Sequence, residues 1–189
     1  MQLQDAIRLR RSTAPVDDRA PQDRELRALL QLAAHAPDHA ALRPWRLVTV
    51  RGEDRRRLGE AMAAGFGDPA GSQAAVKTAA KTSRAPLLVG VLVCYQDHPK
   101  VPPREQLAAT VAMVTTLQLL LFEAGWTAMW RSGPPVELAE VQAAMGVGSD
   151  EQLLGWLYIG ATAAGGASSA EPEDLGARLR PMPGPAYSA

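Results

Sequence analysis

The chain has 189 residues, of which 47% are hydrophobic and 21% charged, a composition typical of a globular protein and unlike that of a disordered or fibrous one. Lysine plus arginine and aspartate plus glutamate each total 20, so the formal net charge is zero. The chain therefore lacks the surplus of basic residues that is typical of nucleic-acid-binding proteins. This length suits one domain, spanning residues 1–189, with a substantial core.

Cysteine usage and the N-terminus bear on where the protein works. Cys94 is the single cysteine, which excludes an internal disulfide and a cysteine-based zinc site, and its apolar neighbours favour a buried side chain over a nucleophile. The first residues lack the basic and apolar regions of a signal peptide, and we find no apolar run long enough to span a bilayer, which takes about 20 residues. We therefore expect a cytoplasmic protein with no membrane partner.

The spacing of apolar residues and the positions of Pro and Gly predict interleaved helices and strands. The first half is expected to contain, in order, helices over 3–10 and 23–33, a strand over 45–50, and helices over 53–64 and 73–83. The second half is expected to contain strands over 86–95, 126–130 and 153–160, with helices over 105–124 and 135–145 between them. Residues 161–189 are rich in Ala, Gly, Ser and Pro, which is typical of an extended or flexible arm.

The predicted helix over 105–124 is the longest element and carries few charges. It is apolar nearly all round, and a helix of this kind is buried on all sides. In so short a chain, complete burial favours a dimer interface. The elements together indicate an α+β (α/β type) protein with a mixed central sheet flanked by helices, and neither a Rossmann nor a P-loop glycine motif is present.

Two polar segments stand out as ligand contacts. Residues 10–12, Arg-Arg-Ser, end the first predicted helix, and their guanidinium and hydroxyl donors suit a phosphate monoester, although such a cluster can equally be a solvated helix end. Residues 130–133, Trp-Arg-Ser-Gly, follow a predicted strand and lead into a turn. Backbone N–H groups at such a strand end can face a ligand.

Acid–base candidates are few. His35 and His39 are four residues apart, but Pro37 between them argues against a zinc-binding pair on one helix face. Asp38 beside His39 would need a nucleophilic serine to form a hydrolase triad, and no Gly-x-Ser-x-Gly motif occurs. We therefore favour a turn over a triad for Asp38.

Four short motifs, in order, resemble the nitroreductase family of FMN-dependent flavoproteins that oxidise nicotinamide nucleotides, and most closely its short branch of NAD(P)H nitroreductases. The motifs are Arg-Arg-Ser at 10–12, Ala-Pro-Asp-His at 36–39 with Pro-Trp at 44–45, Lys-Val-Pro at 100–102 with Glu-Gln at 105–106, and Trp-Arg-Ser-Gly at 130–133. Each motif is modest alone, and their order along nearly the whole chain carries the resemblance.

The resemblance implies a set of FMN-binding residues. They are Arg10, Arg11 and Ser12 at the phosphate, Trp130, Arg131 and Ser132 along the flavin ring, and His35 and His39 as further flavin contacts. By the same resemblance, His39 contacts the flavin of the other subunit across a dimer interface, and residues 120–125 match a nicotinamide-nucleotide region.

The chain departs from the family pattern near the flavin. Larger family members usually carry a basic residue soon after the Arg-x-Ser motif, near flavin N1 and O2, where this chain has Ala14 and Pro15. Positive charge at that edge is expected from Lys100 or Arg131 instead. His35 stands where close relatives carry a basic residue, and an imidazole there would weaken flavin binding or make it sensitive to pH, because it titrates near neutrality.

The expected protein is therefore an oxidoreductase that takes hydride from NADH or NADPH to flavin N5 and passes electrons to a small nitroaromatic or quinone-like acceptor by a ping-pong mechanism. It is expected to be a homodimer with FMN sites at the subunit interface, to use no catalytic side chain and to hold no metal. Two alternatives stay open: a protein that holds or remodels flavin without nitroreductase turnover, and a non-enzymatic dimer whose flavin site has decayed.

Overall fold

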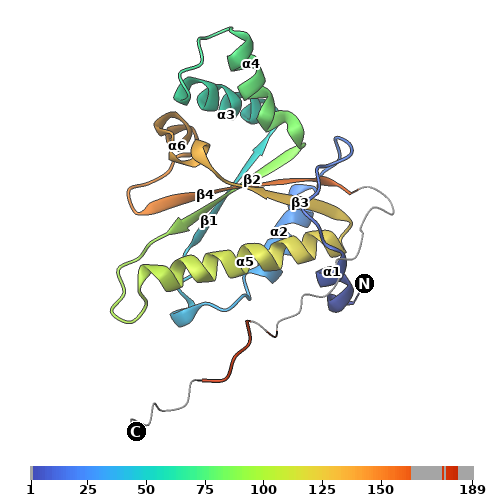
Figure 1. The fold of residues 1–189 in the computed structure, drawn as a ribbon, viewed down its shortest axis with the longest axis vertical. Helices are drawn as coiled ribbons and strands as arrows, with labels where there is room; N and C mark the ends of the chain where they lie inside the picture. The colour runs from blue at the N-terminus through green and yellow to red at the C-terminus, as the bar shows by residue number, and fades with distance from the viewer. Residues whose placement is uncertain (1, 163–175, 177, 183–189) are drawn as a thin grey trace.

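A computed structural model describes residues 2–162, 176 and 178–182, so most of the predicted arm over 161–189 lies outside the described residues. One sheet organises these residues, with helices on both of its faces (Figure 1). Its strands, in the spatial order β1-β2-β4-β3, are β1 (Trp45–Arg51), β2 (Leu87–Cys94), β4 (Glu151–Ala161) and β3 (Trp126–Arg131).

Six α-helices and three 3-10 helices are found among the described residues. The α-helices are α1 (Leu3–Leu9), α2 (Asp23–Ala33), α3 (Gly52–Gly65), α4 (Gln73–Ala79), α5 (Pro103–Glu123) and α6 (Ala139–Met145). The 3-10 helices are η1 (His39–Ala41), η2 (Ala80–Arg84) and η3 (Pro134–Glu137). The predicted helix over 135–145 is divided, because Leu138 adopts extended backbone between η3 and α6. The one predicted over 73–83 begins as α4 and tightens into η2.

All strand pairs in this sheet are antiparallel, although a mixed sheet was expected. β1 ends opposite the start of β2, because α3 and α4 return the chain to the same end of the sheet. α5 carries the chain back along the sheet, so β2 and β3 run in the same direction. β4 lies between them, and no two neighbours are parallel. The order of strands, which the sequence pattern does not contain, decides this point.

The core lies on both faces of the two central strands, β2 and β4, which are almost entirely buried. On one face Leu87, Val89 and Leu157 pack against α2 and α5. On the other face Leu88 and Tyr158 pack against α3 and α6. Alternate residues of a strand point to opposite faces, so a strand buried on both sides is apolar throughout, as the sequence of β2 is.

α5 confirms the predicted long helix but is not covered on all sides within one chain. Met113, Leu117 and Leu121 are buried against the sheet, whereas Val111 on the outer face is 38% exposed. Contrary to the expectation from sequence, this helix is long and apolar enough to cross a membrane, by length and composition alone. Its buried face belongs to the core, which accounts for that composition.

Candidate functional site

The segment after α1 is tied to the outer end of the sheet. Thr13 Oγ1 lies 2.7 Å from Thr127 Oγ1 of β3, and Thr127 Oγ1 donates to the Thr13 carbonyl oxygen at 3.0 Å. The Val16 N–H donates to the carbonyl oxygen of Ala161 in β4. These contacts hold residues 10–12 beside the start of β3.

Residues 10–12 present donors with few partners. Arg10 Nη1 lies 3.5 Å from Ser12 Oγ, and Arg11 Nη1 donates to the Arg10 carbonyl oxygen at 2.8 Å. Arg11 Nη2 is buried with no hydrogen-bond partner, and no described carboxylate pairs with either arginine. A cluster of cationic donors left unpaired in this way suits an anion such as a phosphate.

Pro15 lies in the stretch where the resemblance leads one to expect a basic residue. A Cβ added to Gly160 of β4 would stand 2.6 Å from Pro15 Cβ, so the proline packs directly on the glycine. Pro15 therefore packs the segment after α1 tightly against the sheet, and it supplies no positive charge at this position.

The far end of β3 holds the second predicted segment, Trp130 to Ser132. Four residues separate Thr127 from Arg131, so the strand spans about 13 Å between them. Close to Trp156, which pairs with Arg131, β4 contains a bulge: Val91 pairs with Gly155 and Leu92 with Leu153, which leaves Leu154 as the extra residue. The sheet therefore brings the two predicted segments to one edge strand, one near each end.

A cavity of about 540 Å³ opens beside the end of β3. Its charged and aromatic lining residues are Lys81, Arg84, Arg131, Trp130, Trp156 and Tyr158. No carboxylate is among the residues that line it. Lys81 and Arg84 come from η2, and neither was expected from the sequence.

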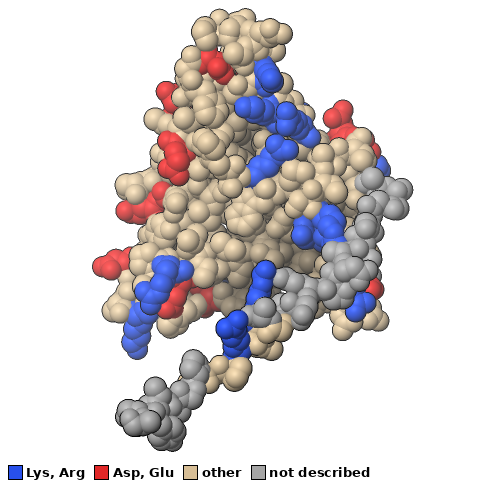
Figure 2. Space-filling view, viewed as in Figure 1, with Lys and Arg blue, Asp and Glu red and all other residues tan. Residues whose placement is uncertain are grey.

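Two of the three cations of this cavity lie over aromatic rings. The Arg131 guanidinium carbon is 5.2 Å from the centroid of the Tyr158 ring, and Lys81 Nζ is 5.5 Å from that of Phe66. Burial raises the pKa of the Tyr158 hydroxyl, and the positive charges of Arg131 and Arg84 partly offset that rise. Figure 2 shows Lys and Arg side chains gathered over α4 and the segment after it on this face of the molecule.

His39 lies in a strained loop. Ala40, Ala41 and Arg43 all have positive φ (62°, 52° and 49°), a region that costs L-residues about 1–2 kcal/mol each. The loop is held by hydrogen bonds at its base: the Arg43 N–H donates to Asp38 Oδ2 at 2.6 Å. Strain of this kind is typical of functional sites, where the surrounding structure compensates for it.

Glu105, in the first turn of α5, fixes the His39 ring. Its Oε2 lies 2.8 Å from His39 Nδ1, and the two side chains are 40% and 56% exposed. Lys100 lies in the loop just before α5, where its backbone N–H donates to His98 Nδ1. His35 is exposed beyond the end of α2, in the turn before Pro37.

One chain does not bring all predicted residues together. α1 packs beside the C-terminal half of α5, near Leu120 and Glu123, whereas His39 contacts its first turn. The 18 residues from Glu105 to Glu123 make this separation about 27 Å along the helix. Figure 1 shows α1 at one end of α5 and the loop that leads into α5 at the other.

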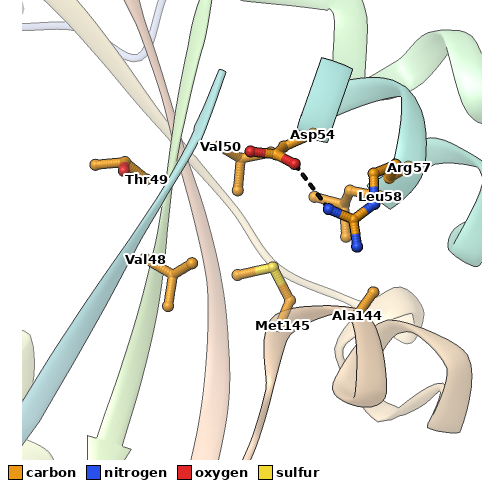
Figure 3. A pocket seen from close by; sticks show the side chains of 8 residues that line it. All are labelled: Val48, Thr49, Val50, Asp54, Arg57, Leu58, Ala144 and Met145. Carbon is orange, nitrogen blue, oxygen red and sulfur yellow. Dashed lines mark hydrogen bonds and ion pairs between the residues drawn. The ribbon is translucent and has the colours of Figure 1, made fainter. Parts of the chain in front are cut away.

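Other hollows and clusters carry less chemistry. A cavity of about 220 Å³ between β1, α3 and α6 has five apolar lining residues, among them Met145, which extends toward β1 (Figure 3). Its polar lining residues are Thr49 and the ion pair of Asp54 with Arg57, at 3.0 Å. Cys94 donates to Glu151 Oε1 at 3.2 Å, and burial raises its pKa to about 11, which makes it a poor nucleophile. Among the described residues, no group of His, Cys, Asp and Glu is arranged to hold a metal ion.

Sequence reasoning missed four residues of this region: Lys81, Arg84, Glu105 and Gly155. Lys81 falls in the helix predicted over 73–83 and Arg84 directly follows it, and only the folded chain shows both at a cavity with the end of β3. Gly155 stood inside an apolar strand, where an isolated glycine can indicate a bulge. Glu105 was part of a recognised motif, but its partner lies 66 residues away in the chain.

Comparisons with known proteins agree with this architecture. The Nitroreductase family model matches residues 7–161. Over 164 residues the chain is 32% identical to a protein of Escherichia coli (strain K12) named as a candidate NAD(P)H nitroreductase, YdjA, and the match covers 82% of this chain and 87% of the relative.

Solved structures show the same fold. A nitroreductase-like family protein from Bacillus cereus superposes with a TM-score of 0.84 at 24% identity, covering 97% of both chains. The FMN- and NADPH-dependent nitroreductase NfnB from sphigopyxis sp. strain HMH superposes with a TM-score of 0.73 at 21% identity, covering 97% of this chain and 100% of that one. From the extent of the family match and the identity to its E. coli relative, the chain belongs to the Nitroreductase family.

Proposed function

We propose that this protein is an FMN-dependent oxidoreductase that takes reducing equivalents from NADH or NADPH and passes them to a small nitroaromatic or quinone-like acceptor. The observation that carries the proposal is the placement of two ligand-binding segments on one edge strand. Residues 10–12 are tied to the start of β3 through Thr13 and Thr127, and Trp130 to Ser132 end the same strand.

The residues present fit FMN. Arg10, Arg11 and Ser12 would hold its phosphate, and the buried, unpartnered Arg11 Nη2 is a donor that an anion would satisfy. Trp130, Arg131 and Ser132 would lie along the flavin ring, beside a cavity that contains cations and no carboxylate. When bound, FMN would supply the redox chemistry that links hydride donation by NADH or NADPH to reduction of the acceptor, in a ping-pong sequence.

The protein's own groups bind, orient and shield rather than react. The cations beside Trp130 would favour negative charge on a bound ring, because preorganised charge acts strongly where water is excluded. No side-chain nucleophile is needed for this chemistry. The raised pKa of Cys94 and its distance along β2 from η2 are consistent with a structural role for the one thiol.

We propose that the working unit is a homodimer. His39, His35 and Lys100 lie toward the other end of α5 from residues 10–12, so a second copy would have to bring them to the flavin. Apolar side chains remain exposed on α1, α2 and α5, namely Leu3, Ile7, Leu32 and Val111. A second copy packed on this face would cover them and complete the site.

Flavin loading tests the proposal directly. The purified protein is expected to carry or take up FMN and to bleach on anaerobic addition of NADH or NADPH. Arg10→Ala should weaken FMN binding by about 10- to 100-fold, because hydrogen bonds to a charged group contribute about 1.5–3 kcal/mol. Arg8→Ala is the matched control, since Arg8 is an exposed arginine in the last turn of α1, two residues before Arg10. The proposal is contradicted if the protein binds no FMN, or if Arg10→Ala and Arg8→Ala weaken FMN binding equally.

The dimer has a test of its own. Sedimentation at micromolar concentration should give twice the 20.1 kDa of one chain. Val111→Arg should shift the protein toward monomer and lower its flavin content, whereas Val76→Arg, on the exposed side of α4, should change neither. A wild-type monomer that binds FMN fully would overturn the shared site.

One observation favours a second candidate, a flavin-holding or flavin-remodelling protein without nitroreductase turnover. Pro15, packed on Gly160, stands where larger family members usually carry a cation near the flavin. This alternative would be supported if bound FMN is reduced by light but by neither NADH nor NADPH.

A further inference from the structure

The cavity between η2 and the end of β3 is built for a ligand with negative charge. Lys81 and Arg84 enter it from η2 and Arg131 enters it from β3, and no carboxylate lines it. No described carboxylate forms an ion pair with any of these three cations. Three like charges around one hollow repel one another, and a bound anion would relieve that repulsion.

The same cavity is also built for a flat ring. Trp130, Trp156 and Tyr158 contribute aromatic surface to its wall. Trp156 is only 2% exposed, so its ring is held firmly in that wall. A volume of about 540 Å³ is within the range of small-molecule sites.

We propose that this cavity binds a planar aromatic group that carries negative charge at its edge, with Lys81 and Arg84 as its charge-recognising residues. The inference rests on the proposed function, because the cavity adjoins the segment proposed to hold the flavin. Two sources share this chemistry: an acceptor that bears an acidic group, and the polar edge of the flavin itself. Both would place a flat ring against the aromatic wall and an anionic edge toward η2.

The position of the two cations supports this role over a solvated surface. η2 is anchored at Thr82, whose hydroxyl donates to the carbonyl oxygens of Arg55 and Ala79 at 2.7 and 2.9 Å. Thr82 is fully buried, so Lys81 and Arg84 project from a fixed turn. Arg84 is also close enough to Tyr158 to influence the pKa of its hydroxyl.

Two probes, one anionic and one neutral, separate the sources. 4-Nitrobenzoate and 4-nitrobenzyl alcohol share a ring and a nitro group, and their Kd values for the FMN-loaded protein are measured by perturbation of the flavin spectrum without turnover. The midpoint potential of bound FMN is measured in parallel. The variants are Lys81→Gln, Arg84→Gln and the double variant, with Lys77→Gln as the control, since Lys77 is an exposed cation on α4 that does not line the cavity.

If the anion belongs to the acceptor, the double variant should weaken 4-nitrobenzoate about tenfold or more and leave the alcohol within about twofold. If it belongs to the flavin edge, the double variant should bind reduced FMN about tenfold less well relative to oxidised FMN, which lowers the midpoint potential by about 30 mV for a two-electron couple. Lys77→Gln should change neither quantity. A folded, FMN-loaded double variant that matches wild type in both overturns the proposal, as does an equal effect of Lys77→Gln.

Failure of the proposed function is a separate outcome. A wild-type protein that takes up no FMN contradicts that function, but 4-nitrobenzoate binding can still be followed through the fluorescence of Trp130 and Trp156. If the double variant does not fold, by circular dichroism, the single variants decide. Absence of any charge-dependent binding in the folded proteins then overturns the cavity assignment.

Discussion

Gly155 of β4 lies directly against the main chain of Arg131. A Cβ added to Gly155 would stand 2.2 Å from the Arg131 carbonyl oxygen, and the glycine has φ of +127°, which L side chains rarely adopt. Gly155, next to the bulge at Leu154, therefore lets the last residue of β3 approach β4 more closely than any side chain would allow. This contact fixes where the segment from Trp130 to Ser132 leaves the sheet.

Gly155→Ala is expected to displace that segment. The variant should lose about 2–4 kcal/mol of stability, because it combines a backbone clash with a strained φ, and it should bind FMN at least about tenfold more weakly. Gly67→Ala is the control for positive φ alone: Gly67 has φ of +73°, and a Cβ there meets no atom within 4 Å. Urea unfolding and flavin titration measure both effects. Unchanged FMN binding in a folded Gly155→Ala protein would show that this contact does not position the site.

Glu105 is expected to act through His39. A carboxylate at Nδ1 accepts the proton on that nitrogen, which favours the tautomer whose Nε2 can accept a hydrogen bond. Glu105→Ala and His39→Ala should each weaken FMN binding by about 3- to 10-fold, and the double variant should be no worse than the poorer single one. Glu105→Gln should restore much of the affinity, because its side-chain carbonyl oxygen can still accept from Nδ1. Additive losses would show that the two residues act independently.

Glu151 is expected to make the free energy of unfolding depend on pH in the acid range. The Arg46 guanidinium holds the pKa of this carboxyl at about 2, below its ordinary value of 4.5. A carboxyl with a lowered pKa in the folded state contributes its stability above pH 4.5 and loses it as the pH falls toward 2. Glu151→Gln should cost about 1–2 kcal/mol at pH 7. In urea unfolding at stepped pH, the gap between variant and wild type should close below pH 4.5, and a gap that stays constant would contradict the pairing.

Cys94 is expected to resist alkylation in the folded protein. Burial, with a smaller contribution from Glu151, raises the pKa of its thiol to about 11, so about 1% is thiolate at pH 9. Reaction with iodoacetamide at pH 9 should therefore be about 50- to 100-fold slower than for the same chain unfolded in urea. Equal rates in the two states would show that the thiol is neither buried nor held by Glu151.

The sequence predicts those helices and strands whose conformation is decided by residues nearby in the chain. β2 and α5 are continuous apolar segments, and both appear within a few residues of the predicted bounds. The antiparallel pairing, the bulge next to Gly155 and the loop with positive φ at Ala40 depend on contacts between distant residues. For the same reason, residues 10–12 and 130–132 could be named from motifs, whereas Lys81 and Arg84 emerged only when η2 was seen beside β3.

The strand order has a consequence for how such proteins diversify. β2 and β4, at the centre, carry the apolar side chains on which folding depends, whereas β3, at the border, carries the segments proposed to meet ligands. Substitutions at the end of β3 or in η2 can therefore change which small molecules are accepted while the central strands stay as they are.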